Sequence, residues 1–328
     1  MIDLPFYDAL DQPTDVTSKH QYIQQMHEVY KNFYTFQDII SRSQVNALGR
    51  ISSVTVEPDR IIATVSNPDF QYIINLEDSR DCGLESMNFG GFEPIDGHLI
   101  FNACRYLNNF YGQPFSFLDI GSNHGWYSLA ICSMFSDITV HSFEPVPSTF
   151  EKLIGNININ EFSDRIHAHN LAIINKTGAQ EFFFSPTLTG NSSFRDLPSF
   201  TNDKMTIEVD CIGLDTFLSS NNMPTPRLVK VDTEGSEKFV VESAHKFILT
   251  TRPFLFIELS RKWCAAFNYH PNELLDLFHR INYTCFSILN HELSPTYSIL
   301  EETLQTNFLF VPSEHSDQFK SEFTLSLH

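Results

Sequence analysis

Short apolar runs alternate along most of the chain with segments whose apolar residues recur at helical spacing. The runs are rich in β-branched and aromatic residues and predict buried parallel strands at 115–120, 138–143, 166–171, 227–231 and 254–257. Helical spacing follows the first two runs, at 126–134 and 147–157. This alternation of strand and helix predicts an α/β fold built on a mostly parallel sheet.

The first 90 residues follow a different pattern. Residues 1–48 are polar with scattered aromatics, and apolar residues at helical spacing predict a helix from about Ser18 to Ile40. Three short runs within 51–76, separated by Pro-Asp turns, predict an antiparallel meander. Since so small a sheet needs a surface to pack against, we expect residues 1–90 to form an accessory cap on the main domain. The helix would pack there too, or serve as a lid or a dimerisation arm.

A second irregular region lies at 179–212. Two strand-like runs, 180–184 and 205–211, predict an inserted hairpin around a polar loop that begins at Thr189. Long loops at strand ends are where binding functions concentrate. The loop is therefore either a mobile surface loop or a flap over a site, and the sequence leaves both interpretations open.

The turn after the first strand carries the clearest chemical signal. The strand ends at Asp119, and Gly121-Ser122-Asn123-His124-Gly125 then leads into a helix. A glycine permits a sharp turn and a close ligand approach, and the start of a helix presents unpaired N–H groups. Glu144 follows the next strand, where such folds bind ribose hydroxyls. Together these features predict a nucleotide-binding site.

Two nucleotide ligands compete for this site. A dinucleotide fold favours G-x-G-x-x-G, whereas this chain has G-x-N-x-G with Asp119 directly before it. A carboxylate repels a pyrophosphate but attracts the amino group of S-adenosylmethionine. The pattern therefore favours S-adenosylmethionine over NAD. The remaining alternative is a doubly wound domain whose turn merely tolerates glycines.

Four segments, in this order and at this spacing, resemble the FkbM family of S-adenosylmethionine-dependent methyltransferases: 119–128, 143–145, 229–237 and 253–258. The resemblance covers about 90–312, and it departs at Ser122, His124 and Trp126, where the family more often has Ala, Ile and Tyr. It implies a class I methyltransferase (Rossmann-like) sheet over 91–312 with an antiparallel last strand. It also implies O-methylation of sugars or other natural-product hydroxyls. Residues 313–328 are expected to be a poorly anchored tail.

The resemblance also implies a set of donor-binding residues. Asn170, at the end of the third strand, is the candidate for reading the adenine. The full set comprises Asp119, Gly121, Ser122, Asn123, Gly125, Glu144, Pro145 and Asn170.

Three carboxyl groups end neighbouring strands and are the candidates for catalysis. Asp232 and Glu234 follow the fourth strand and Glu258 ends the fifth, so all three should face the crevice where α/β folds bind ligands. Asp232 is the leading candidate for a base or an acceptor-positioning residue, and Glu234 is second. The alternative role of Glu258 is to satisfy backbone groups at the edge of the sheet. The cluster could also hold a hard divalent cation. We favour the base and predict no dedicated metal site, because no histidine–carboxylate spacing supports one.

The amino-acid composition disfavours some classes of binding partner. Lys and Arg total 21 against 40 Asp and Glu, and the net charge of −19 disfavours nucleic acid and acidic membrane surfaces. Six cysteines without paired spacing indicate reduced thiols and a cytoplasmic protein. The first residues lack the pattern of a signal peptide, and no apolar run is long enough to span a bilayer.

Three functions follow from these observations. The favoured one is O-methylation of a saccharide or secondary-metabolite hydroxyl, with a small molecule or glycan as substrate. The alternatives are an NAD-dependent oxidoreductase and a catalytically silent methyltransferase fold that serves as a binding module. A homodimer through the N-terminal region is a further expectation.

Overall fold

The computed structural model describes residues 49–89, 91–196, 203–289 and 292–323. The helix predicted within 18–40, and the dimerisation arm assigned to it, lie outside these residues. Within them, no helix has both the length and the apolar character that crossing a membrane requires. All six cysteines are buried free thiols, as the sequence predicts.

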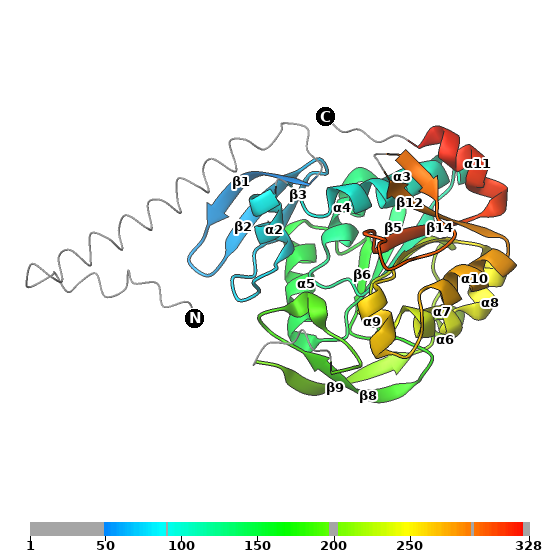
Figure 1. The fold of residues 1–328 in the computed structure, drawn as a ribbon. Helices are drawn as coiled ribbons and strands as arrows, with labels where there is room; N and C mark the ends of the chain where they lie inside the picture. Colours follow the sequence, from blue (N-terminus) through cyan, green and yellow to red (C-terminus); the bar gives the residue numbers. More distant parts are fainter. Residues whose placement is uncertain (1–48, 90, 197–202, 290–291, 324–328) are drawn as a thin grey trace, which may run out of the picture.

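An eight-stranded sheet forms the centre of the molecule (Figure 1). Its strand order is β13-β12-β14-β11-β10-β4-β5-β6. The strands are β4 (Phe115–Ile120), β5 (Ile138–Phe143), β6 (Ile166–His169), β10 (Pro226–Val231), β11 (Phe254–Glu258), β12 (Tyr283–Leu289), β13 (Glu292–Pro295) and β14 (Asn307–Pro312).

The direction of these strands identifies the fold. β6, β5, β4, β10 and β11 are parallel to one another, whereas β14 lies antiparallel between β11 and β12. A short antiparallel strand, β13, forms the edge. This is the predicted class I methyltransferase sheet, mostly parallel with an antiparallel last strand.

Helices cover both faces of the sheet because successive strand residues point to opposite sides. Phe117 belongs to the hydrophobic core on one face and Leu118 to the core on the other. The helices are α3 (Pro94–Tyr111), α4 (Trp126–Met134), α5 (Pro147–Ile159), α6 (Leu214–Ser220), α7 (Glu237–Ser243), α8 (His245–Thr251), α9 (Arg261–Ala266), α10 (Asn272–Arg280) and α11 (Ser313–Glu322).

The predicted meander is present in the described part of the cap, residues 49–89. Strands β1 (Arg50–Val56), β2 (Ile61–Ser66) and β3 (Phe70–Ile73) pair antiparallel in sequence order, and α2 (Cys82–Phe89) follows. Figure 1 shows these blue strands beside α4 and α5. Tyr72 of β3 is fully buried in the same core as residues of α4 and α5, so the cap packs directly on the sheet's helices.

The hairpin predicted within 179–212 is also present. β8 (Gly178–Phe184) pairs antiparallel with β9 (Met205–Ile212), and β7 (Ala172–Ile173) joins β9 in parallel to make a separate small sheet. A single 3₁₀ turn, Thr189–Asn191, lies in the loop between β8 and β9.

The expectation of a poorly anchored tail is wrong for residues 313–322. They form α11, whose Phe319 is 1% exposed and packs edge-on against Phe254 of β11. Glu314 also accepts two hydrogen bonds from Arg252, at 2.5 and 2.7 Å. One large aromatic side chain and one ion pair therefore attach a segment whose composition is otherwise polar.

Candidate active site

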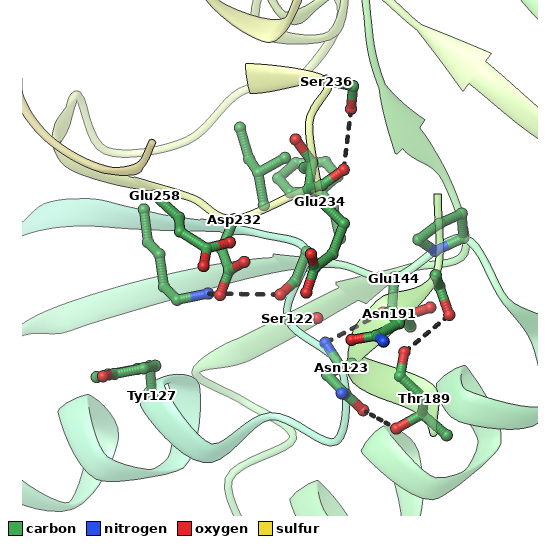
Figure 2. Close-up of a pocket in the computed structure, with 18 of the residues that line it drawn as sticks. Ser122, Asn123, Tyr127, Glu144, Thr189, Asn191, Asp232, Glu234, Ser236 and Glu258 are labelled. Atoms are coloured by element: carbon green, nitrogen blue, oxygen red, sulfur yellow. Dashed lines mark hydrogen bonds and ion pairs between the residues drawn. The ribbon is translucent and has the colours of Figure 1, made fainter. Parts of the chain in front are cut away.

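The carboxyl ends of β4, β5, β10 and β11 open into a cavity of about 240 Å³. As Figure 2 shows, most of the predicted site residues converge on it from separate strands. Those that line it are Gly121, Ser122, Asn123, Glu144, Pro145, Asp232, Glu234 and Glu258. The fold thus brings these eight predicted residues together around one cavity. Asp119, Gly125 and Asn170 lie outside the lining.

Gly121 allows the ends of β4 and β10 to approach closely. Its φ of 79° is left-handed, and a Cβ at this position would lie 1.7 Å from the carbonyl oxygen of Asp232. From the sequence, we expect a ligand to approach this glycine closely. In the structure, the neighbouring backbone by itself leaves no room for a side chain there. Gly125 is similar, because its Cβ would lie 2.5 Å from Cδ1 of Leu153.

Asp119 lies beneath the glycine turn instead of in the cavity. It is 1% exposed, accepts a hydrogen bond from the Ser128 hydroxyl at 2.6 Å, and lies 3.8 Å from Nζ of Lys230. Burial raises the pKa of Asp119, and Lys230 opposes this rise. The expected direct contact with the donor's amino group is therefore corrected to an anchoring role between β4 and α4.

Glu144 has the geometry expected of a ribose-binding carboxylate. It is 5% exposed, and its two oxygens accept hydrogen bonds from the backbone N–H groups of Asn123, at 3.1 Å, and Val146, at 2.9 Å. Burial raises its pKa to about 7, although these two hydrogen bonds oppose the rise. Each oxygen keeps a lone pair that can accept from a ligand hydroxyl.

Asn170 does not line the cavity. Its exposed side chain donates to the carbonyl oxygens of Glu144, at 2.8 Å, and Pro145, at 3.0 Å. It therefore holds the loop that carries Glu144, whereas the next two residues, Leu171 and Ala172, line the cavity. The position of Asn170 therefore does not support the adenine contact that the sequence predicts for it.

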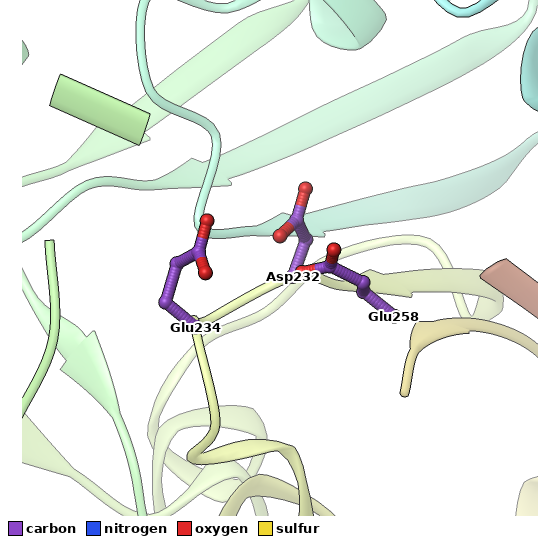
Figure 3. A group of neighbouring side chains, drawn as sticks. All are labelled: Asp232, Glu234 and Glu258. Atoms are coloured by element: carbon purple, nitrogen blue, oxygen red, sulfur yellow. The ribbon is translucent and has the colours of Figure 1, made fainter. Parts of the chain in front are cut away.

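The three predicted catalytic carboxyl groups do meet. Oxygens of Asp232, Glu234 and Glu258 lie within 4.8 Å of one another, and all three residues are half-buried (Figure 3). Burial and then the charge of Asp232 raise the pKa values of Glu234 and Glu258 well above the ordinary range. Oxygen ligands at this spacing suit a hard divalent cation, and they also suit carboxyl groups that share a proton.

Lys230 is a site residue that the sequence analysis missed. It is 3% exposed, and its Nζ lies 2.9 Å from Oδ2 of Asp232 and 3.5 Å from the carbonyl oxygen of Gly121. Burial alone would lower its pKa, but Asp232 and Asp119 outweigh that effect and raise it. The sequence signal that could have identified it is a lysine between two buried valines, Val229 and Val231.

Glu93 was also missed, because its Gly-Gly-Phe-Glu-Pro context indicates only a loop. Tyr127 donates a hydrogen bond to Oε2 of Glu93 at 2.8 Å, and both residues line the cavity. Burial, followed by the charge of Asp232, raises the pKa of Glu93 to about 7. Glu93 thus adds a further carboxyl group to a cavity that is already acidic.

With this geometry in place, comparison with known families decides the identity. The profile of the family described as "Methyltransferase FkbM domain" matches residues 119–285, about half of the chain. The chain belongs to the FkbM methyltransferase family. The match begins at Asp119 and includes the glycine turn, Glu144 and all three clustered carboxyl groups, so the FkbM domain contains the cavity's strand ends.

Two curated relatives align with parts of this FkbM protein. "Methyltransferase 1" of Beauveria bassiana is 25% identical over 165 residues, which cover 45% of this chain and 66% of the relative. "Hexuronic acid methyltransferase AglP" of Haloferax volcanii is 30% identical over 145 residues, 43% of this chain and 54% of the relative. The chain thus spans about two thirds and about half of their lengths.

Solved structures show more distant similarity. A methyltransferase FkbM from Methylobacillus flagellatus KT is 17% identical, with a TM-score of 0.39, over 60% of this chain and 43% of that one. An O-methyltransferase from Bacillus cereus in complex with SAH is 11% identical, with a TM-score of 0.38, over 66% of this chain and 80% of that one.

Proposed function

We propose that this protein transfers a methyl group from S-adenosylmethionine to a hydroxyl group of a saccharide or a related natural product. One observation carries the proposal: a single cavity has Glu144 at one side and the clustered carboxyl groups of Asp232, Glu234 and Glu258 at the other. Glu144 can bind the ribose of a nucleoside, and the clustered carboxyl groups can accept a proton from a hydroxyl group. Family membership supports methyl transfer.

The charge of the cavity favours this donor. Its described lining carries two basic side chains, Arg80 and Lys230, and the acidic side chains of Glu85, Glu93, Glu144, Asp232, Glu234 and Glu258. Lys230 is paired with Asp232 and Arg80 with Glu85, at 2.9 Å in both cases. Such a cavity attracts a sulfonium cation and repels a pyrophosphate. NAD is therefore disfavoured by charge as well as by the glycine pattern.

The protein's own residues have separate tasks in the proposed reaction. S-adenosylmethionine supplies an activated methyl group when bound, so the chain mainly aligns donor and acceptor. Glu144 would hold the ribose hydroxyls, and the turn at 121–123 would lie along the donor. The acceptor hydroxyl would lie at the clustered carboxyl groups, where its proton can leave.

The surroundings of those carboxyl groups support different roles for them. Asp232 is engaged by Lys230 at 2.9 Å, and this ion pair fixes its position. Glu234 has an oxygen, Oε2, without a hydrogen-bond partner, and its pKa is raised. We therefore assign acceptor positioning to Asp232 and proton removal to the ionised form of Glu234, whose raised pKa makes that form a stronger base. Glu258 holds the proton that the pair shares before the acceptor's proton is transferred to Glu234.

The saccharide part of the proposal is supported by one of the relatives, which is named for the methylation of hexuronic acid. The cavity's polar lining also suits a polyhydroxyl acceptor. A catalytically silent fold remains the competing proposal. It predicts donor binding without methyl transfer to any glycan or metabolite.

Calorimetric titration of the purified protein tests the donor. We expect S-adenosylhomocysteine to bind and NAD to show no heat of binding. Because charge-assisted hydrogen bonds contribute about 1.5–3 kcal/mol, Glu144→Ala should weaken this binding by about tenfold or more. Glu181→Ala, which removes an exposed carboxylate on β8, serves as the control.

Unchanged affinity in Glu144→Ala would refute the donor assignment. The acceptor is then sought with methyl-labelled donor and a panel of neutral sugars, uronic acids and cell extract, with products identified by mass spectrometry. Labelled glycan supports the proposal. Donor binding without any labelled product supports the silent fold instead.

A further inference from the structure

The cap and the glycine turn are connected at consecutive residues. Asn123 and His124 occupy the middle of the turn, and each is bonded to a chain of side chains that ends in the cap. Asn123 lines the cavity, whereas His124 is buried behind it. The turn is thus held both from within the cavity lining, at Asn123, and from behind it, at His124.

The first link runs through His124. The hydroxyl of Tyr72 lies 3.1 Å from Nδ1 of His124 and 3.2 Å from Oδ2 of Asp81. His124 and Asp81 are each 1% exposed, and Tyr72 is fully buried. Polar groups this deeply buried are costly to leave unpaired, so these three side chains constrain one another.

The second link runs through the loop between β8 and β9. The Thr189 hydroxyl donates a hydrogen bond to the carboxylate of Asp78 in the cap. The same hydroxyl lies 3.2 Å from Oδ1 of Asn123, as Figure 2 shows. Ser79 of the cap donates twice to the carbonyl oxygen of Thr187, from its backbone and its side chain, each at 3.0 Å. The loop is therefore fastened to the cap on one side and to the turn on the other.

A third contact runs through α5. The amide of Asn156, which is fully buried, accepts from the backbone N–H of Ile73 in β3 at 2.7 Å and donates to the carbonyl oxygen of His124 at 2.9 Å. Trp126, directly after the turn, packs edge-on against Phe70 and Tyr72 of β3. The cap therefore contacts the turn through both hydrogen bonds and aromatic packing.

We propose that the cap is a positioning element of the donor site. By this proposal, which rests on the proposed function, Tyr72 and Thr189 hold the turn in the conformation that binds the donor. The turn needs such support, because Asn123 has a left-handed φ of 49° while its N–H must meet the Glu144 carboxylate at 3.1 Å. Loss of the links would let the turn relax and would misplace Glu144.

Two deletions of single hydroxyl groups test the proposal in the full chain. Tyr72→Phe and Thr189→Val each remove one link and keep the shape of the side chain. We expect each to weaken S-adenosylhomocysteine binding about three- to tenfold and the double variant about thirtyfold. Thr189→Ser, which retains the hydroxyl, should bind within about twofold of the wild type. At saturating donor, kcat should stay within about twofold.

Ser52→Ala is the matched control, since its hydroxyl bonds only within the cap, to the carbonyl oxygen of Thr64 at 3.0 Å. Affinity within twofold of the wild type in the folded double variant would overturn the proposal. If the wild type itself binds no S-adenosylhomocysteine, the proposed function fails, and amide hydrogen exchange then decides the positioning role. Faster exchange at 121–125 in the double variant supports it, and unchanged exchange refutes it.

Discussion

At the scale of single residues, Asp232 and Glu234 differ because only Asp232 forms an ion pair with Lys230. Lys230 lies among Asp119, Asp232 and the Gly121 carbonyl oxygen, so its charge is used to gather the ends of β4 and β10. Asp232 is thereby fixed in position. Glu234, whose φ of 50° is left-handed, presents an oxygen without a hydrogen-bond partner. Asp232 and Glu234 therefore lie close together, but Lys230 holds Asp232, whereas Glu234 has an oxygen available to accept a proton.

Two isosteric variants, assayed with an acceptor in the presence of chelator, distinguish these roles. Glu234→Gln removes the proposed base and should lower kcat by about a hundredfold or more, with donor affinity nearly unchanged. Asp232→Asn should raise the acceptor KM more than it lowers kcat, because it misplaces the acceptor. If chelator alone stops the wild-type reaction and magnesium restores it, a cation bound by the three carboxyl groups replaces the base. Near-full turnover of Glu234→Gln in chelator would return the role to Asp232, the leading candidate from sequence.

At the scale of elements, α11 shows how a few side chains can attach a helix. Phe319 is 1% exposed and contacts the rings of Tyr106 and Phe254, which join α3 to β11. The rest of α11 is largely exposed and polar. The helix therefore contributes to stability through a small, specific contact far along the sequence from the glycine turn.

Phe319→Ala should destabilise the fold by about 3–5 kcal/mol, since it removes a large buried aromatic side chain. Urea unfolding of the apoprotein measures this change. The exposed Lys320→Ala on the same helix should cost less than about 0.5 kcal/mol. Donor affinity of the folded Phe319→Ala protein should equal that of the wild type. A loss of stability similar to that of the control would mean that α11 is not anchored as described.

The central strands were predictable from the sequence, whereas α11 was not. The central strands were predicted within a residue or two, because strands buried on both faces are continuous apolar runs. The spacing of His315 and Phe319 is too sparse to form an apolar stripe, so α11 was missed. The cavity's strand-end acids were predicted, since strand ends of one sheet must meet. The roles of Asp119, Asn170 and Lys230 were not, because they depend on side chains that only the folded chain brings opposite them.

At the scale of the whole molecule, many carboxyl groups gather at the site of a protein whose net charge is already strongly negative. Burial is the largest cause that raises the pKa values of Glu93 and Glu144 to about 7 and of Asp96 to about 6. Between about pH 4.5 and 7 these three groups therefore bind more protons in the native state than in the unfolded state. By linkage, their contribution to the free energy of unfolding falls as the pH rises through this window. Burial lowers the pKa values of His141 and His169 to about 4, so these two groups contribute in the opposite direction.

From pH 6 to pH 8 the free energy of unfolding of the apoprotein should change by about 2 kcal/mol more in the destabilising direction in the wild type than in a Glu93→Gln/Glu144→Gln variant, because glutamine does not titrate. Urea unfolding of both proteins at both pH values measures this difference. Affinity for S-adenosylhomocysteine should rise from pH 6 to pH 8 in the wild type, as Glu144 ionises. An equal pH dependence of stability in the two proteins would show that these carboxyl groups ionise in the folded protein as they do in the unfolded chain.

The position of β14 has a consequence for how the protein is made. β11 and β12 are separated in the sheet by β14, although both are synthesised before it. On the ribosome, β4, β5, β6 and β10 can pair as they emerge, and the donor side of the cavity can form. β11 and β12 must wait with unpaired edges until residues 307–312 arrive to fill the gap. A nascent chain stalled before residue 307 would carry two exposed strand edges, which are the sites where chaperones or other nascent chains would bind.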